Sequence, residues 1–222
     1  MAKNHGWVFE VPANARGLIA PEPLYALGRF NHEAACVDPE TGFVYLTEDR
    51  DDSVLYRFIP KQSGQLAMGG RLQAMQVVGA PDLRNWSATS LRPSGVSAVN
   101  WLDLDDVESP KDDLRHRAQA KGASLIARGE GIHMAQGEAY ICSTSGGAAR
   151  LGQILRLHLS DTGEQDRLEL FFESVSTRQF NFGDNLTVAP NGHLVVCEDQ
   201  YTEKVDNFLR GITPEGHAYP CL

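Results

Sequence analysis

The stretch Gly28–Pro60, GRFNHEAACVDPETGFVYLTEDRDDSVLYRFIP, decides the fold class because it contains a complete unit of strands and turns. A short apolar segment follows Glu33, the chain turns at residues 38–42 (DPETG), and a second apolar segment runs up to Glu48. A third segment returns over residues 54–58. Proline and glycine in the connection supply the fixed and the positive φ that a hairpin needs. The stretch therefore predicts an antiparallel β-meander with acids at its strand ends.

The same pattern recurs twice. Residues 130–147 (EGIHMAQGEAYICSTSGG) and residues 184–200 (DNLTVAPNGHLVVCEDQ) each open with an acid, turn at a glycine and end in polar residues. Each return strand also carries an arginine: Arg57, Arg156 and Arg210. Short strands at even spacing, four to a unit of roughly 40–50 residues, are typical of a β-propeller. We therefore expect an all-β fold, an incomplete propeller of about four to five blades over 1–222 as a single domain.

Residues 79–122 interrupt the strand pattern, and we expect them to form an insertion or one decorated blade. Residues 110–121 (PKDDLRHRAQAK) predict a short helix within this insertion. Ser109 precedes this segment as a candidate cap, and Pro110 would occupy the first position, where a missing N–H costs nothing.

Charge and composition argue against several classes of protein. The chain has 222 residues, a formal net charge of −9 and scattered basic residues, so it lacks the basic stripe of a nucleic-acid-binding protein. No apolar run approaches the roughly 20 residues of a membrane span, and the start MAKNHGWVFEV lacks the regions of a signal peptide. We expect no nucleic-acid or membrane partner, and the cellular location stays unknown. The four cysteines show no CxxC spacing, which argues against a zinc ribbon.

The acids at the strand ends are candidate metal ligands. In a propeller the first strand of each blade lines the central channel, so acids at its start would meet at one mouth and repel unless a cation lies among them. Carboxylate and amide oxygens suit Ca²⁺ or Mg²⁺. The alternative role is turn capping, which accounts for Asp49 and Asp199. The predicted metal ligands are Glu33, Glu48, Glu130, Asp184, Asn185 and Glu198.

Arg128 adds a feature that a purely structural metal site does not need. Arg128 and Glu130 are two positions apart, so on a strand both side chains project to one face. A guanidinium beside metal-binding carboxylates suits a phosphate substrate, which it can grip through two hydrogen bonds. We therefore predict Arg128 and Glu130 as catalytic residues. The alternative is that Arg128 only pairs with Glu130.

Three phrases carry a resemblance to a known family: GRFNHEAACVDPETGFVYLTEDRDDSVLYRFIP, ARGEGI and DNLTVAPNGHLVVCED. They resemble the PhoX-type family of bacterial alkaline phosphatases over nearly all of residues 6–216. The resemblance implies a β-propeller with Ca²⁺ and Fe³⁺ at its axial mouth that hydrolyses phosphate monoesters, in proteins usually exported to the periplasm or beyond. It also implies that Arg128 binds the substrate phosphate and that the metal-site carboxylates are Glu33, Glu48, Glu130 and Glu198.

The chain departs from this family at both ends. An upstream segment with a Trp-rich phrase and a Cys-Glu-Glu metal motif is absent, and so is a downstream Phe-Ser-Pro-Asp-Gly type turn. We therefore expect a fragment that associates with a missing propeller segment or with itself, that lacks residues which help to hold iron, and that is inactive if the site is incomplete. The alternative functions are a non-catalytic, calcium-stabilised propeller that binds a partner, and a lactonase-like metal hydrolase.

Overall fold

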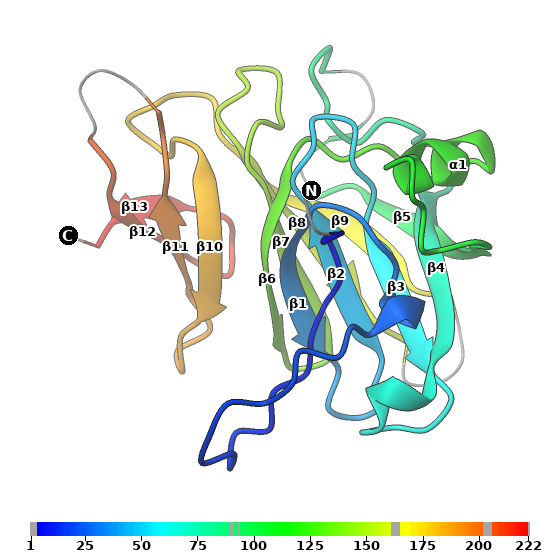
Figure 1. Ribbon diagram of the computed structural model, residues 1–222. Coiled ribbons are helices and arrows are strands. Elements are labelled where there is room, and N and C mark those ends of the chain that lie inside the picture. Colours follow the sequence, from blue (N-terminus) through cyan, green and yellow to red (C-terminus); the bar gives the residue numbers. More distant parts are fainter. Residues whose placement is uncertain (1–3, 89–90, 93, 161–164, 202–205, 222) are drawn as a thin grey trace.

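The computed structural model describes residues 4–88, 91–92, 94–160, 165–201 and 206–221, and it is nearly all β (Figure 1). One sheet has nine strands in the order β1-β2-β3-β4-β5-β9-β8-β7-β6, and a second sheet has four strands in the order β10-β11-β12-β13. The strands of the first sheet are β1 (His32–Val37), β2 (Val44–Glu48), β3 (Tyr56–Pro60), β4 (Gly70–Val77), β5 (Val96–Asp103), β6 (Gly129–Ala135), β7 (Glu138–Ser143), β8 (Gln153–His158) and β9 (Arg167–Glu173). Those of the second are β10 (Gly183–Val188), β11 (Leu194–Glu198), β12 (Leu209–Ile212) and β13 (Ala218–Pro220).

The strands group into three antiparallel meanders, β1–β4, β6–β9 and β10–β13, and the expectation of an all-β fold is confirmed. Strand β5 pairs with β4 on one side and β9 on the other, which joins the first two meanders into one sheet. The described residues form three such units, fewer than the four to five expected. The reason is that residues 79–122 contribute β5 and α1 rather than a four-stranded unit of their own.

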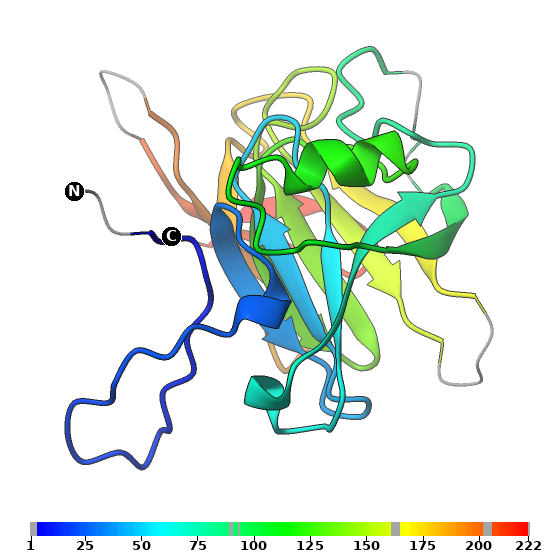
Figure 2. The ribbon, with the colours of Figure 1, turned by 45° about the vertical axis from the view of Figure 1, so that its right-hand side comes forward.

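The first strands of the three meanders are neighbours. Strand β6 packs against β1 on one side and against β10 on the other. All three begin at the same end of the molecule, the upper end in Figure 1, where the loops that follow β2 and β7 also lie. Residues 10–22 form a loop that extends away from the sheets in both views (Figures 1 and 2). The arrangement brings together residues that are far apart in the sequence.

Three apolar clusters hold the meanders together. The first joins the two meanders of the large sheet around Leu55, Met75, Ile141 and Leu155, which are fully buried. The second packs the first meander under α1, and the third joins the second meander to the small sheet through Phe180. Burying each of these side chains contributes roughly 1.5–3 kcal/mol. The strands are therefore held in place by closely packed apolar side chains.

The predicted short helix is confirmed, but α1 (Leu114–Ala120) begins later than the predicted position at Pro110. Ser109 and Asp112 have φ of 34° and 54°, which no α-helix accommodates, so residues 109–113 form turns. Ser109 still acts near the helix start, because its Oγ accepts a hydrogen bond from the Asp113 N–H at 3.0 Å. Within the described ranges, none of the helices has the length and hydrophobicity needed to span a lipid bilayer.

Candidate functional site

The first strand of each meander carries a β-bulge at its upper end, and the three bulges lie at matching positions. The pairing register shifts within residues 32–35 of β1, 129–132 of β6 and 183–186 of β10. A bulge twists a strand locally and turns a side chain in a new direction, and bulges are common beside functional sites. The residues inside the three bulges include the three predicted acids Glu33, Glu130 and Asp184.

Three carboxylates meet at this end of the molecule. One carboxylate oxygen each from Glu33, Asp49 and Glu130 lies within 4.8 Å of the other two. Glu33 is exposed, Asp49 is half-buried and Glu130 is buried, so the group lies at the surface with a protected floor. Asp49 is positioned by the loop after β2, where its backbone N–H donates to the Asn31 carbonyl oxygen at 3.2 Å. We call Glu33, Asp49 and Glu130 the acid cluster.

The acid cluster holds more negative charge than its surroundings neutralise. Burial, together with the smaller effects of the charges of Asp49 and Asp184, raises the pKa of Glu130 to about 8 against the opposing effect of Arg128. Burial also raises the pKa of Glu33, with smaller contributions from Asp184 and Asp49. A cation among these oxygens would relieve this repulsion, because it favours the ionised form of each carboxyl group.

Arg128 contacts the acid cluster directly. Its Nε donates to Asp49 Oδ1 at 2.7 Å and its Nη2 donates to Glu130 Oε1 at 2.7 Å. The backbone of Arg128 has a φ of 50°, and it is held by hydrogen bonds to Arg50 and Thr144. Within the described residues, its Nη1 has no hydrogen-bond partner, so one edge of the guanidinium stays available. The predicted proximity of Arg128 and Glu130 is therefore present.

Asp184 and Asn185 approach the acid cluster because β6 has a glycine where the two strands come closest. A Cβ on Gly131 would lie 2.7 Å from Asn185 Cα and 2.8 Å from the Asp184 carbonyl oxygen, closer than packed atoms come. Asp184 acts on Glu130 through its charge and a hydrogen bond. The Asn185 side chain accepts a hydrogen bond from the Leu186 N–H at 2.9 Å. Both residues thus border the acid cluster.

Glu48, a predicted metal ligand, lies outside the acid cluster. Its side chain is fully buried, accepts a hydrogen bond from the Tyr56 hydroxyl at 2.9 Å and lies 3.5 Å from Nη1 of Arg115. Burial raises the pKa of Glu48 to about 7. Neighbours on a strand point to opposite faces. The Thr47 hydroxyl donates to the Glu130 carbonyl oxygen at 2.6 Å, so Thr47 faces β6 and Glu48 points away from it.

Glu198 is likewise placed away from the acid cluster. Its Oε1 accepts hydrogen bonds from Arg210 Nε at 2.7 Å and from the Asn181 N–H at 2.9 Å, and its Oε2 accepts one from the Phe208 N–H at 3.0 Å. Glu198 therefore holds the third meander together. The arginine on the return strand, Arg210, was the sequence signal for the pairing with Glu198. Strand alternation was the sequence signal that places Asp49 rather than Glu48 in the acid cluster.

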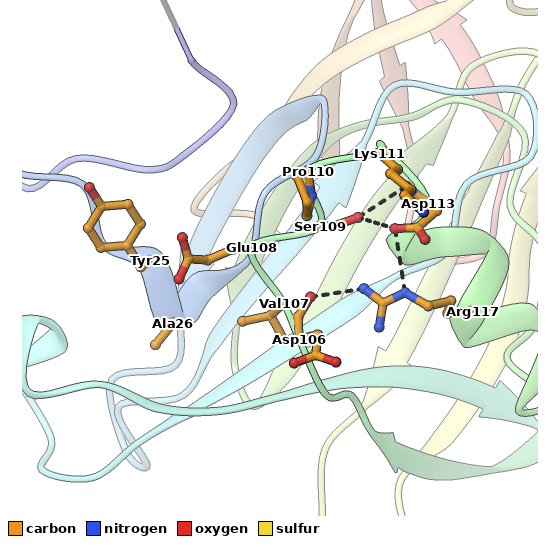
Figure 3. A pocket seen from close by; sticks show the side chains of 10 residues that line it. All are labelled: Tyr25, Ala26, Asp106, Val107, Glu108, Ser109, Pro110, Lys111, Asp113 and Arg117. Carbon is orange, nitrogen blue, oxygen red and sulfur yellow. Dashed lines mark hydrogen bonds and ion pairs between the residues drawn. The ribbon is translucent and has the colours of Figure 1, made fainter.

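The cavity of about 810 Å³ beside η1 (Tyr25–Leu27) is separate from the acid cluster, and Figure 3 shows the side chains that line it. Its arginine, Arg117, donates to the carbonyl oxygens of Asp105 and Asp106 at 2.7 and 2.9 Å. The guanidinium of Arg117 is therefore already hydrogen-bonded within the protein. No residue of the acid cluster lines this cavity, and we do not assign the chemistry to it.

Comparisons with known proteins place this geometry in context. The family described as alkaline phosphatase PhoX matches residues 1–222. The fold is similar to the solved structure of Pseudomonas fluorescens PhoX in complex with vanadate, a transition state analogue, with a TM-score of 0.69 and 19% sequence identity. That match covers 97% of this chain and 49% of the other, so this chain spans about half the length of the solved one. No curated protein matches the chain significantly.

Proposed function

Because the chain belongs to the alkaline phosphatase PhoX family, we propose that it contributes a metal-dependent site at which phosphate monoesters are hydrolysed. The observation that carries this proposal is the acid cluster with Arg128 bonded to two of its carboxylates. Three carboxylates within 4.8 Å are suited to a cation, and an adjacent guanidinium is suited to an anionic substrate. The vanadate in the similar structure supports the same class of substrate.

We propose further that the three meanders are blades of a β-propeller, which would make the upper end its axial mouth. The support comes from the packing of β6 between β1 and β10, which are the first strands of their meanders. The matching bulges support it as well, because each blade then presents its acid at the same height. In this arrangement Glu33, Glu130 and Asp184 face one channel mouth.

The residues present fit Ca²⁺. The donor set is made only of oxygen atoms, which hard cations prefer, and three carboxylates share one bonded guanidinium among the described residues. We propose that Glu33, Asp49 and Glu130 hold the cation, with Asp184 and Asn185 beside them. Fe³⁺ would share these oxygen ligands, since no cysteine among the described residues belongs to the acid cluster. A bound cation would supply Lewis acidity toward a phosphoryl oxygen.

The chain's own residues have two tasks in this proposal. Arg128 binds the phosphate through its free edge and stabilises the negative charge of the transferring group. Glu130 supplies a carboxylate to the cation and helps to orient Arg128 through the 2.7 Å hydrogen bond from Nη2. Asp49 orients Arg128 through the 2.7 Å hydrogen bond to Nε.

A non-catalytic calcium-binding propeller is the second candidate. The observation that favours it is the pairing of Arg128 with Asp49 and Glu130, which occupies two of the three guanidinium nitrogens with protein carboxylates. In that case Arg128 would neutralise the acid cluster rather than bind substrate. The two candidates differ in whether removing Arg128 abolishes turnover.

Hydrolysis of p-nitrophenyl phosphate at alkaline pH, with and without added Ca²⁺, tests the proposal. Arg128→Ala and Glu130→Gln should each lower kcat/KM by at least roughly a hundredfold, because each removes a group that acts in the transition state. Asp199→Asn is the matched control, since Asp199 follows a strand end as Asp49 does but lies outside the acid cluster. Activity that survives both substitutions would exclude this site, and calcium binding without turnover would favour the second candidate.

A further inference from the structure

Trp86 lies between two arginines at the upper end of the molecule. The Cζ atoms of Arg84 and Arg150 each lie 4.2 Å from the centre of the Trp86 ring. Both guanidiniums therefore lie against the indole ring. The indole Nε1 donates to the Ser145 carbonyl oxygen at 2.8 Å, which fixes the ring. Each cation–π contact at an exposed site contributes about 0.5–1 kcal/mol, and the repulsion between the two guanidinium charges opposes this gain.

We call Arg84, Trp86 and Arg150 the layer. The layer is joined to the loop that bears Asp49. Ser145 Oγ donates to Asp51 Oδ1 at 3.1 Å, and Arg84 Nη1 donates to the Asp51 carbonyl oxygen at 3.5 Å. Asp51 follows Asp49 by two residues, a separation of at most about 7 Å along an extended chain. Figures 1 and 2 show that the loops after β2, β4 and β7 gather at one end. The layer therefore lies at the same end of the molecule as the acid cluster and is joined to the loop that bears Asp49.

The two arginines differ in what neutralises them. Arg84 is paired with Asp82 through two hydrogen bonds, Nε to Oδ1 at 2.9 Å and Nη2 to Oδ2 at 2.7 Å. Arg150 is exposed, and among the described residues its side chain has neither an ion pair nor a hydrogen bond. Arg150 therefore presents a positive charge that the protein has not used, held in place by the ring beneath it.

The layer also limits the kind of ligand. Two guanidiniums lie against the Trp86 ring and its N–H is bonded, so the indole is already engaged within the protein. What remains is the guanidinium of Arg150, which recognises carboxylate and phosphate groups. Because stacking already orders this side chain, binding an anion costs less conformational entropy than at a free surface arginine.

We propose that Arg150 is a specificity residue that binds a second anionic group on the leaving-group side of the substrate. The site would then favour phosphate monoesters whose leaving group carries a carboxylate or another phosphate over esters with a neutral leaving group. This inference rests on the proposed phosphatase function, because it assumes that the ester phosphate lies at Arg128 and the acid cluster.

Two substrates of nearly equal size test the inference: phenyl phosphate and 4-carboxyphenyl phosphate. In the wild type kcat/KM should be higher for the carboxylated ester, and Arg150→Gln should lower that value roughly five- to tenfold, the range of one partly solvated charge-assisted bond. The value for phenyl phosphate should stay unchanged. Arg167→Gln is the matched control, because Arg167 is an exposed arginine at the opposite end of the β8–β9 pair. Equal losses for both esters in Arg150→Gln would overturn the proposal.

Calorimetric binding of the matched phosphonates separates this proposal from the proposed function. If the wild type hydrolyses neither ester, the phosphatase proposal fails, but binding still tests Arg150. The protein as purified should bind 4-carboxyphenylphosphonate more tightly than phenylphosphonate, and Arg150→Gln should remove the difference. Equal affinity of the wild type for both phosphonates would overturn the role of Arg150 whatever the outcome for turnover.

Discussion

Replacing Arg128 by alanine should abolish phosphatase activity and at the same time make the stability of the protein depend more strongly on Ca²⁺. In the structure the guanidinium neutralises Asp49 and Glu130 through two bonds of 2.7 Å. Without it, the acid cluster keeps three carboxylates within 4.8 Å and has no bonded cation. A divalent ion would then be the main source of compensating charge, and it would no longer be repelled by Arg128.

The size of the effect follows from the geometry. Two negative charges at the 4.8 Å limit of the acid cluster repel by roughly 3.5 kcal/mol at an effective dielectric constant of about 20. Arg128 is 26% exposed, so solvent screening reduces its share to about 1–2 kcal/mol. That corresponds to about a tenfold gain in Ca²⁺ affinity, or roughly 3–5 °C in melting temperature for a chain of this size.

Thermal unfolding in EDTA and in excess Ca²⁺ measures this directly. Arg128→Ala should melt below the wild type in EDTA, and the difference should shrink or vanish in Ca²⁺. Arg167→Ala serves as the control, because it removes an exposed arginine far from the acid cluster. A difference between Arg128→Ala and wild type that is the same in EDTA and in Ca²⁺ would refute the reasoning.

Three further predictions concern stability. The pKa of Glu130 is raised from 4.5 to about 8, so its favourable contribution is full below pH 4.5 and is lost as pH rises through 8. Metal-free protein should therefore lose stability progressively between about pH 4.5 and 8 and level off above pH 8, and urea unfolding of Glu130→Gln should show a flatter pH profile. Arg210→Ala should lower the free energy of unfolding by about 3–5 kcal/mol, because it strands the buried Glu198 carboxylate, whereas Glu198→Gln with Arg210 intact should cost less; equal costs in chemical denaturation would argue against a buried ion pair. Gly131→Ala should force β6 and β10 apart, which would lower both the melting temperature and Ca²⁺ affinity, and unchanged calorimetric binding would contradict that close approach.

Strand periodicity was enough to predict the meanders, because alternating apolar residues and glycine turns are local signals. It predicted the start of each first strand and the position of Glu33, Glu130 and Asp184 within it. Residues 79–122, expected as an insertion or one decorated blade, contribute the linking strand β5 and the helix α1. The helix start was wrong because the positive φ of Ser109 and Asp112 has no signature in those residue types.

The candidate site was harder to predict because strands β2 and β11 each end in two adjacent acids whose side chains point in opposite directions. Glu48 and Glu198 are buried against Tyr56 and Arg210, whereas Asp49 joins the acid cluster. Which of two adjacent acids faces the site depends on the register set by the bulge, and the register is a property of pairing between strands. Alternation along β2 was the available signal, since Asp49 shares a face with Thr47.

Titration of metal-free protein with Ca²⁺, measured by isothermal calorimetry, tests the central claim that Glu33, Asp49 and Glu130 form the cation site. Asp49→Asn removes a cluster carboxylate and should weaken Ca²⁺ binding by at least about tenfold, because affinity depends on the number of charged ligands. Glu48→Gln changes the neighbouring residue, which is hydrogen-bonded to Tyr56, and should leave the affinity close to that of the wild type. Loss of binding in Glu48→Gln with normal binding in Asp49→Asn would contradict the assignment.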